Sequence, residues 1–245
     1  MNSHFFYLIT AFMLAFGLST ALTPLVRRFA IRKGQVAEPR ADRWHSRPIP
    51  LMGGVALFSA FSITLIAALL FMPASILPSK YLPLLACAFF VFALGLMDDI
   101  YGMSPQTKLV GQVVAASVLV FFGFKIDWFV SYTYNTFFSV LWIVGITNAF
   151  NLLDNMDGLA AGIALISSLF LTVITLLNLG NGFANGQLVI LIVFMGVLLG
   201  FLLFNFHPAS IFMGDSGSLF IGFVLAGLTT HQRVFHSSHF LPILL

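Results

Sequence analysis

The chain has 245 residues, of which 60% are hydrophobic and only 8% are charged. Soluble domains carry roughly 25% charged residues, so a water-soluble globule of this size could not bury so much apolar surface. The net charge of +3 does not indicate a nucleic-acid partner, because seven of the eleven basic residues lie together between Arg27 and Arg47. A basic loop beside an apolar run is typical of the cytoplasmic side of a membrane protein.

Long apolar runs follow one another along the whole chain. A helix needs about 20 apolar residues to cross the hydrocarbon, and these runs are too continuous for the alternating strands of a barrel. In chain order we predict spans at 5–26, 51–72, 81–97, 109–124, 136–150, 158–177, 187–206 and 217–230. A ninth span begins near Phe240. We therefore predict an all-α, polytopic transmembrane helix bundle of eight complete spans and the start of a ninth.

Counting the crossings assigns the ionisable residues to one side of the membrane. If the basic loop is cytoplasmic, the N-terminus lies outside. The segments that return to the cytoplasmic face are then 98–108, 151–157 and 207–216. The acids on these segments are Asp98, Asp99, Asp154, Asp157 and Asp215. Ionisable groups at membrane depth are costly, so these acids are candidates for function.

The first acidic segment, from Gly95 to Gly102, contains the adjacent residues Asp98 and Asp99. Neighbouring side chains on a helix point about 100° apart, so a shared carboxylate pair is not expected. One acid would hold a cation or a donor while the other acts as a base. The alternative is a solvated helix end, but acids at a helix C-terminus oppose the helix dipole.

The other two segments combine acids with amides, glycines and hydroxyl groups. If residues 151–157 are helical, Asp154 and Asp157 share a face, with Asn151 one turn earlier. Helix capping explains one of these residues but not all of them. Glycine and serine surround Asp215, which suits a backbone that approaches phosphates or a metal, although a simple helix cap is the alternative.

Two basic residues are candidates for binding an anion. Lys108, one turn before Gln112, either reaches the lipid head groups or contacts a phosphate. His45 either binds an anion or is an ordinary loop residue. Several carboxylates without cysteine ligands favour a hard cation such as Mg²⁺, which takes one or two carboxylates plus substrate phosphates. The residues therefore indicate metal-assisted phosphate chemistry at the cytoplasmic membrane surface, without naming a substrate.

These segments resemble the polyprenyl-phosphate N-acetylhexosamine-1-phosphate transferase superfamily. The matching pieces are MGG at 52–54, LGLMDD at 94–99, KLVGQ at 108–112, NLLDNMDG at 151–158 and FNFHPASIFMGDSGS at 204–218. They occur in the family's order over most of the chain. DRWHSRPIPLMGG at 42–54 and the NLLDNMDG segment look more like the bacterial N-acetylglucosamine branch than the phospho-N-acetylmuramoyl-pentapeptide transferases.

The resemblance implies a membrane enzyme that uses Mg²⁺, with Mn²⁺ as a substitute. It would transfer N-acetylglucosamine 1-phosphate from UDP-N-acetylhexosamine to undecaprenyl phosphate and release UMP. This would be the first membrane step of O-antigen, teichoic acid or a related glycan, at the cytoplasmic face of the inner membrane. Membrane lipid surrounds such a protein, and the resemblance also suggests a homodimer.

Three other functions remain open at this point. The first is a phospho-N-acetylmuramoyl-pentapeptide transferase. The second is a transporter or flippase, which would be expected to carry ionisable groups near mid-span. The third is an inactive scaffold, which would not need three acidic segments.

The resemblance also implies roles for individual residues. Asp215 and Asn151 look like metal or pyrophosphate contacts, and Asp98 looks like the base that deprotonates the lipid phosphate, with Asp99 supporting the metal site. The matched substrate residues are Asp154 and Asp157 for the donor, Asn205 and Phe212 for the uridine, and Lys108 for a phosphate. Direct attack by the lipid phosphate and a covalent aspartyl route both fit this placement.

Family members usually continue through further spans and a histidine-rich cytoplasmic loop. We therefore expect residues 1–245 to form a single transmembrane catalytic domain that is truncated at its C-terminal end. The crossing count places His231, His236 and His239 outside, so the histidine motif is not transferred to them.

Overall fold

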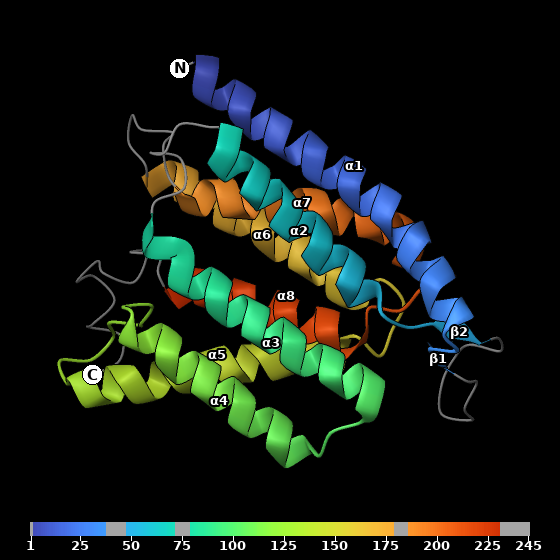
Figure 1. Cartoon of the computed structure of the whole chain (residues 1–245). Helices are drawn as coiled ribbons and strands as arrows, with labels where there is room; N and C mark the ends of the chain where they lie inside the picture. Colours follow the sequence, from blue (N-terminus) through green and yellow to red (C-terminus); the bar gives the residue numbers. More distant parts are fainter. Residues whose placement is uncertain (1, 38–47, 72–78, 179–185, 231–245) are drawn as a thin grey trace.

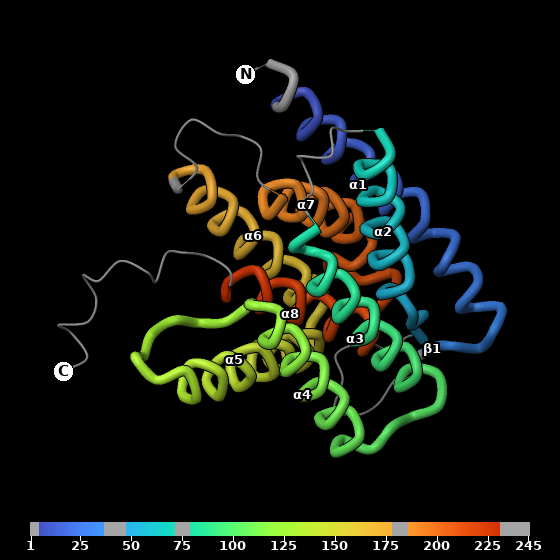
Figure 2. Tube along the Cα trace, turned by 60° about the vertical axis from the view of Figure 1, so that its left-hand side comes forward, coloured from blue at the N-terminus to red at the C-terminus, as the bar shows by residue number. Residues whose placement is uncertain are grey.

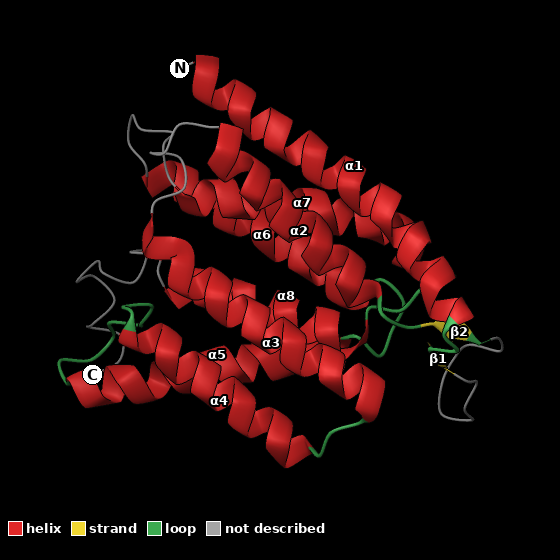
Figure 3. Ribbon diagram, in the orientation of Figure 1, coloured by secondary structure: helices red, strands yellow, loops and turns green. Residues whose placement is uncertain are grey.

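The computed structural model describes residues 2–37, 48–71, 79–178 and 186–230, and these residues form helices with one short sheet (Figures 1 and 3). The helices are α1 (Asn2–Arg32), α2 (Gly53–Phe71), α3 (Leu82–Tyr101), α4 (Pro105–Phe121), α5 (Tyr132–Leu153), α6 (Leu159–Asn178), α7 (Gly186–Asn205) and α8 (Gly214–Thr230). A 3-10 turn, η1 (Ser79–Tyr81), precedes α3. The strands β1 (Val36–Ala37) and β2 (Ile49–Pro50) pair antiparallel beside the C-terminal end of α1.

The prediction of an all-α membrane bundle is confirmed. Six helical segments in the described residues are long and apolar enough to cross a membrane, and α4 is a shorter apolar helix. The predicted number of spans and the outside position of the N-terminus remain predictions. Helix α5 begins at Tyr132, four residues before the predicted 136. The predicted ninth span lies outside the described residues.

Helix α8 lies inside the bundle, surrounded by α2, α3, α5 and α6 (Figure 2). Glycines allow its neighbours to come close, as is usual where helices pack in membranes. A Cβ atom on Gly222 would lie 2.8 Å from the Cα of Thr147 in α5. On the side of α3, a Cβ on Gly95 would lie 2.5 Å from the backbone oxygen of Asp215. The start of α8 is therefore held at close quarters by α3, and its middle by α5.

The start of α2 and Pro50 before it are hydrogen-bonded to the segment before α8. The backbone N–H groups of Gly53 and Gly54 donate to the carbonyls of Phe212 and Met213, at 2.9 and 2.7 Å. In return, the N–H of Phe212 donates to the carbonyl of Pro50 at 2.8 Å. The MGG motif at 52–54 thus has a structural task, because it helps to anchor the turn that leads into Asp215.

Helix α1 packs along α7. Gly196 of α7 faces the backbone of α1, where a Cβ would lie 2.7 Å from the oxygen of Phe12. The hydroxyl of Ser19 in α1 donates to the carbonyl of Val197, the residue after Gly196, at 2.8 Å, and Ser19 is fully buried. This hydrogen bond joins two helices that contain no acidic residue.

Candidate active site

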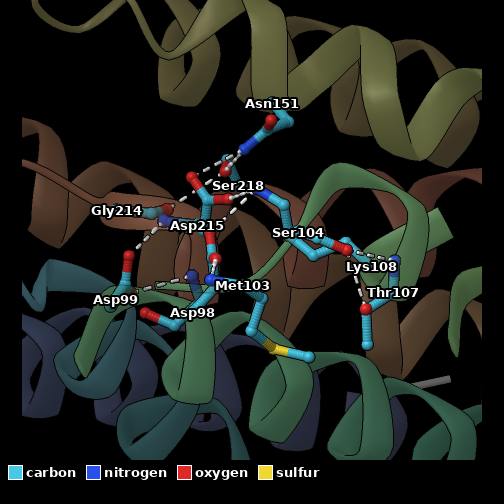
Figure 4. A network of polar contacts seen from close by, with 11 residues as sticks. Asp98, Asp99, Met103, Ser104, Thr107, Lys108, Asn151, Gly214, Asp215 and Ser218 are labelled. Carbon is cyan, nitrogen blue, oxygen red and sulfur yellow. Dashed lines mark hydrogen bonds and ion pairs between the residues drawn. The ribbon is translucent and has the colours of Figure 1, made fainter. Parts of the chain in front are cut away.

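Asp215 lies in the first turn of α8, and side chains from two other helices meet its carboxylate (Figure 4). The ammonium of Lys108, from α4, lies 2.6 Å from Oδ2. The amide of Asn151, from α5, donates to Oδ1 at 3.0 Å. A carboxylate at a helix N-terminus also interacts favourably with the helix dipole. Each oxygen of Asp215 therefore has its own partner from a different helix.

Lys108 also binds Asp98, so one ammonium joins two carboxylates. Its Nζ lies 2.8 Å from Oδ2 of Asp98, while Oδ1 of Asp98 accepts the backbone N–H of Met103 at 2.5 Å. The side chains of Lys108, Asp98 and Asp215 are 21%, 14% and 27% exposed. Because so little of each group reaches solvent, water and salt screen the charges less than they would on a surface.

The short connection between α3 and α4 explains how Lys108 comes back to Asp98. Gly102 ends α3 with φ of 69°, a conformation that glycine adopts without strain. Ser104 then caps α4 by accepting the N–H of Thr107 at 3.2 Å, and Pro105 takes the first helical position. Lys108 follows in the first turn of α4, close to the end of α3.

Asp99 has a different task from its neighbour Asp98. Its Oδ1 and Oδ2 accept the backbone N–H groups of Asp215 and Ser216, at 2.8 and 3.0 Å. The first N–H groups of a helix have no partner within the helix, so Asp99 caps α8 from α3. Gly214 leaves room for this contact, since a Cβ there would lie 2.8 Å from Oδ2 of Asp99. Asp98 thus binds the ammonium of Lys108, whereas Asp99 caps α8. The roles predicted for Asp98 as a base and for Asp99 in supporting a metal site remain predictions.

Ser218 extends the group around Asp215, and the sequence reasoning did not single it out. Its Oγ accepts the second N–H of the Asn151 amide at 3.0 Å and donates to the carbonyl of Gly214 at 3.0 Å. The signal was present, because Ser218 lies three residues after Asp215 and helical residues at that spacing share a face.

Asp157 lies in the turn between α5 and α6 and contacts the loop that follows α7. Its Oδ2 accepts the backbone N–H of Ala209 at 3.0 Å and lies 2.9 Å from Nδ1 of His207. Asp154 directly follows α5, at the C-cap position. The structure therefore brings Asp98, Lys108, Asn151 and Asp215 together, whereas Asp157 binds residues of the loop between α7 and α8. The roles predicted for Asp154 and Asp157 in donor binding remain predictions.

Asn205 and Phe212, the residues matched to uridine binding, both shape the loop between α7 and α8. The amide of Asn205 donates to the carbonyl of Ile211 at 3.0 Å, and the residue is only 2% exposed. The backbone of Phe212 pairs with Pro50 and Gly53, as described above. A contact with uridine remains a prediction for both. His45 lies outside the described residues.

The oxygen atoms around Asp215 fit a hard cation in part. Among the described residues, no three His, Cys, Asp or Glu side chains converge on a common point that could hold a metal. Asp98 and Asp215 do direct two carboxylates at one cation, the ammonium of Lys108. Mg²⁺ typically takes only one or two carboxylates from the protein and completes its shell with phosphate and water oxygens. The donor set is therefore suited to Mg²⁺ in the presence of a phosphate substrate.

Comparison with known proteins relates the chain to a family of sugar-phosphate transferases. The family model for glycosyl transferase family 4 matches residues 81–232. A probable undecaprenyl-phosphate N-acetylglucosaminyl 1-phosphate transferase of Bacillus subtilis is 35% identical over 97% of this chain and 67% of its own length. A decaprenyl-phosphate N-acetylglucosaminephosphotransferase of Mycolicibacterium smegmatis is 37% identical over 87% of this chain. The match covers only 58% of that relative, less than two thirds of its length.

A second group of relatives is named for a different transferred group, phospho-N-acetylmuramoyl-pentapeptide. The phospho-N-acetylmuramoyl-pentapeptide-transferase of Levilactobacillus brevis is 32% identical over 87% of this chain and 72% of its own length. The similarity thus extends to both branches that the sequence motifs resemble, with higher identity to the N-acetylglucosamine enzymes.

Proposed function

Because the chain belongs to glycosyl transferase family 4, we propose that it transfers a sugar phosphate from a UDP-sugar to undecaprenyl phosphate. N-acetylglucosamine 1-phosphate is the proposed group, since the N-acetylglucosamine relatives have the higher identity. The observation that carries the proposal is the meeting of Asp98, Lys108, Asn151 and Asp215 from four helices at one point. In the cell, this reaction would begin O-antigen, teichoic acid or a related envelope glycan on the cytoplasmic face of the inner membrane.

The proposed reaction is a single phosphoryl transfer. An oxygen of undecaprenyl phosphate attacks the phosphorus that carries the sugar, and a new P–O bond forms. The bond between that phosphorus and the oxygen it shares with UMP breaks, and UMP leaves. Such transfers depend mainly on positioning and on offsetting negative charge. The half-buried ammonium of Lys108 between two carboxylates supports this reading.

The residues have separate proposed tasks. Asp98 accepts the proton of the lipid phosphate, and Lys108, which lies between Asp98 and Asp215, shifts toward the phosphates when they bind. Asp215 and Asn151 would hold Mg²⁺, with Mn²⁺ as a substitute, and the ion would offset the charge of the pyrophosphate. Asp99 keeps the backbone of Asp215 in place through the cap on α8.

Membranes that contain the full-length protein test this proposal directly. They are incubated with undecaprenyl phosphate, Mg²⁺ and one radiolabelled donor at a time. UDP-N-acetylglucosamine should give a lipid-linked product and UMP. Product from UDP-N-acetylmuramoyl-pentapeptide alone would assign the chain to the other branch. No lipid product from any UDP-sugar would contradict the enzyme reading and favour a transporter or a scaffold.

A further inference from the structure

Gln112 and Asn148 form a polar contact between α4 and α5 that the proposed reaction does not use. The amide of Asn148 donates to Oε1 of Gln112 at 2.5 Å, and also to the carbonyl of Val144 in its own helix at 2.8 Å. Gln112 is only 2% exposed. Asn148 is therefore anchored to α5 and holds a buried side chain of α4. We call this contact the amide clamp.

The amide clamp lies one helical turn from the residues around Asp215. Gln112 comes four residues after Lys108 on α4, and Asn148 comes three residues before Asn151 on α5. Residues at these spacings lie on the same face of a helix. The two helices thus meet in two successive layers. In one layer Lys108 and Asn151 reach the two oxygens of Asp215, and in the other Gln112 and Asn148 bind each other.

Helix α5 is well placed to act as the fixed side of the clamp. Thr147, the residue before Asn148, packs against Gly222 of α8 so closely that a Cβ on Gly222 would lie 2.8 Å from its Cα. Helix α8 in turn carries Asp215. The position of α4 relative to Asp215 therefore depends on how α4 is held against α5.

Helix α4 has one exposed apolar face. It packs against α3 and α5, while Val110, Val114 and Phe121 are among its exposed apolar side chains. An apolar contact tolerates sliding, because it has no preferred direction. A buried hydrogen bond does not, since an amide that loses its partner in hydrocarbon finds no water to replace it.

We propose that the amide clamp sets the position of Lys108 relative to Asp215, so that Gln112 and Asn148 are positioning residues for the transfer reaction. This inference rests on the proposed function, since its main readout is product formation. Neither side chain needs to touch the substrate. Loss of the clamp lets α4 slide or rotate against α5, and Lys108 moves with it. Misplacing a catalytic group by about 1 Å can cost on the order of 100-fold in rate.

Two variants test the clamp, so that the test does not depend on the correct folding of a single variant. Gln112→Met removes the acceptor, keeps the length of the side chain and leaves the Asn148 amide with only its bond to the carbonyl of Val144. Gln112→Met combined with Asn148→Leu replaces both partners by apolar groups of similar shape, which is often nearly neutral for stability. We expect each to lower turnover by about tenfold or more, while the double variant inserts and melts like the wild type.

Ser19→Ala is the matched control. It removes another buried hydrogen bond between helices, the one from Ser19 in α1 to Val197 in α7, and neither helix carries Asp98, Lys108, Asn151 or Asp215. Turnover should stay within about twofold of the wild type, because substitutions at independent sites do not couple. Wild-type turnover in the double clamp variant, or an equal loss in Ser19→Ala, would overturn the inference.

A mutant cycle with Lys108→Ala separates positioning from general packing. If the clamp acts through Lys108, adding the double clamp variant to Lys108→Ala should slow turnover by less than about twofold more. Losses that multiply would show that the clamp has only a packing role, and the inference would be wrong. A wild-type protein that forms no product would contradict the proposed function itself, and this inference with it.

Discussion

Asp99 reaches from α3 to the start of α8, where its Oδ1 accepts the backbone N–H of Asp215 at 2.8 Å. Its other oxygen accepts the N–H of Ser216, so one carboxylate satisfies two N–H groups at a buried helix end. The acid next to Asp98 thus controls where the Asp215 backbone lies. Asp99 affects the candidate active site through the helix that carries Asp215.

Substitution of Asp99 tests this helix cap. Asp99→Ala leaves two backbone N–H groups without partners, and we expect a loss of about 1–3 kcal/mol in folding free energy together with reduced turnover. Asp99→Asn keeps one acceptor oxygen, so its loss of stability should be smaller. Thermal unfolding in detergent gives the order of the two variants. An alanine variant that melts like the wild type would show that Asp99 is not needed to hold α8.

Lys108 holds two carboxylates together, and its removal should cost activity more than stability. In Lys108→Ala, Asp98 and Asp215 face each other without the ammonium between them. We expect turnover to fall by about 100-fold, the usual scale for the loss of one charged group that stabilises a transition state. Lys108→Arg keeps the charge and should retain part of the rate. Equal rates in the lysine and alanine forms would remove Lys108 from the site.

Gly95 tests whether the close approach of α3 to α8 matters for the site. A methyl group there would lie 2.5 Å from the backbone oxygen of Asp215, so Gly95→Ala must push α3 and α8 apart. Overpacking of this kind typically costs about 1–3 kcal/mol, and turnover should fall as Asp215 moves.

Gly145→Ala is the control for this substitution. Gly145 is also inside a helix, but a Cβ there would meet nothing within 4 Å. Its melting temperature and turnover should match or exceed the wild-type values, because alanine favours helix more than glycine does. If both alanine variants behave alike, the contact between Gly95 and Asp215 has no special importance.

Removal of divalent cations tests the proposed use of Mg²⁺. Chelation with EDTA should stop product formation, and added Mg²⁺ or Mn²⁺ should restore it, since both bind carboxylate and phosphate oxygens. A second readout does not depend on activity: binding of Mn²⁺, followed by its paramagnetic resonance signal, should weaken in Asp215→Asn. Full turnover in excess EDTA would contradict the metal proposal.

The fold class could be predicted because membrane helices leave a strong signal, namely runs of apolar residues of helical length. The beginning of α5 was missed because Tyr132–Asn135 is polar and resembles a loop. In the structure the Asn135 side chain accepts the N–H groups of Trp128 and Phe129, so a polar first turn binds the loop before it. That contact depends on the path of the loop, which periodicity does not describe.

The gathering of Asp98, Lys108, Asn151 and Asp215 could be anticipated from the order of the motifs and the crossing count. The partners of each side chain could not. Whether Asp98 or Asp99 faces Lys108 depends on the rotation of α3 about its axis. The contact of Asp157 with Ala209 depends on a loop 52 residues further along the chain. Such contacts join segments that are far apart in sequence and leave no local pattern.

The most direct test of the central claim compares Asp215 with Asp127, an acid in segment 125–135, which the crossing count places on the outer side of the membrane. Asp215→Asn and Asp127→Asn each replace one carboxylate by an amide of the same shape, and insertion of both is checked by detergent chromatography. The measurement is the rate at which labelled sugar phosphate passes from UDP-N-acetylglucosamine to undecaprenyl phosphate. Our account predicts almost no product with Asp215→Asn and a near wild-type rate with Asp127→Asn. A near-normal rate with Asp215→Asn would contradict it.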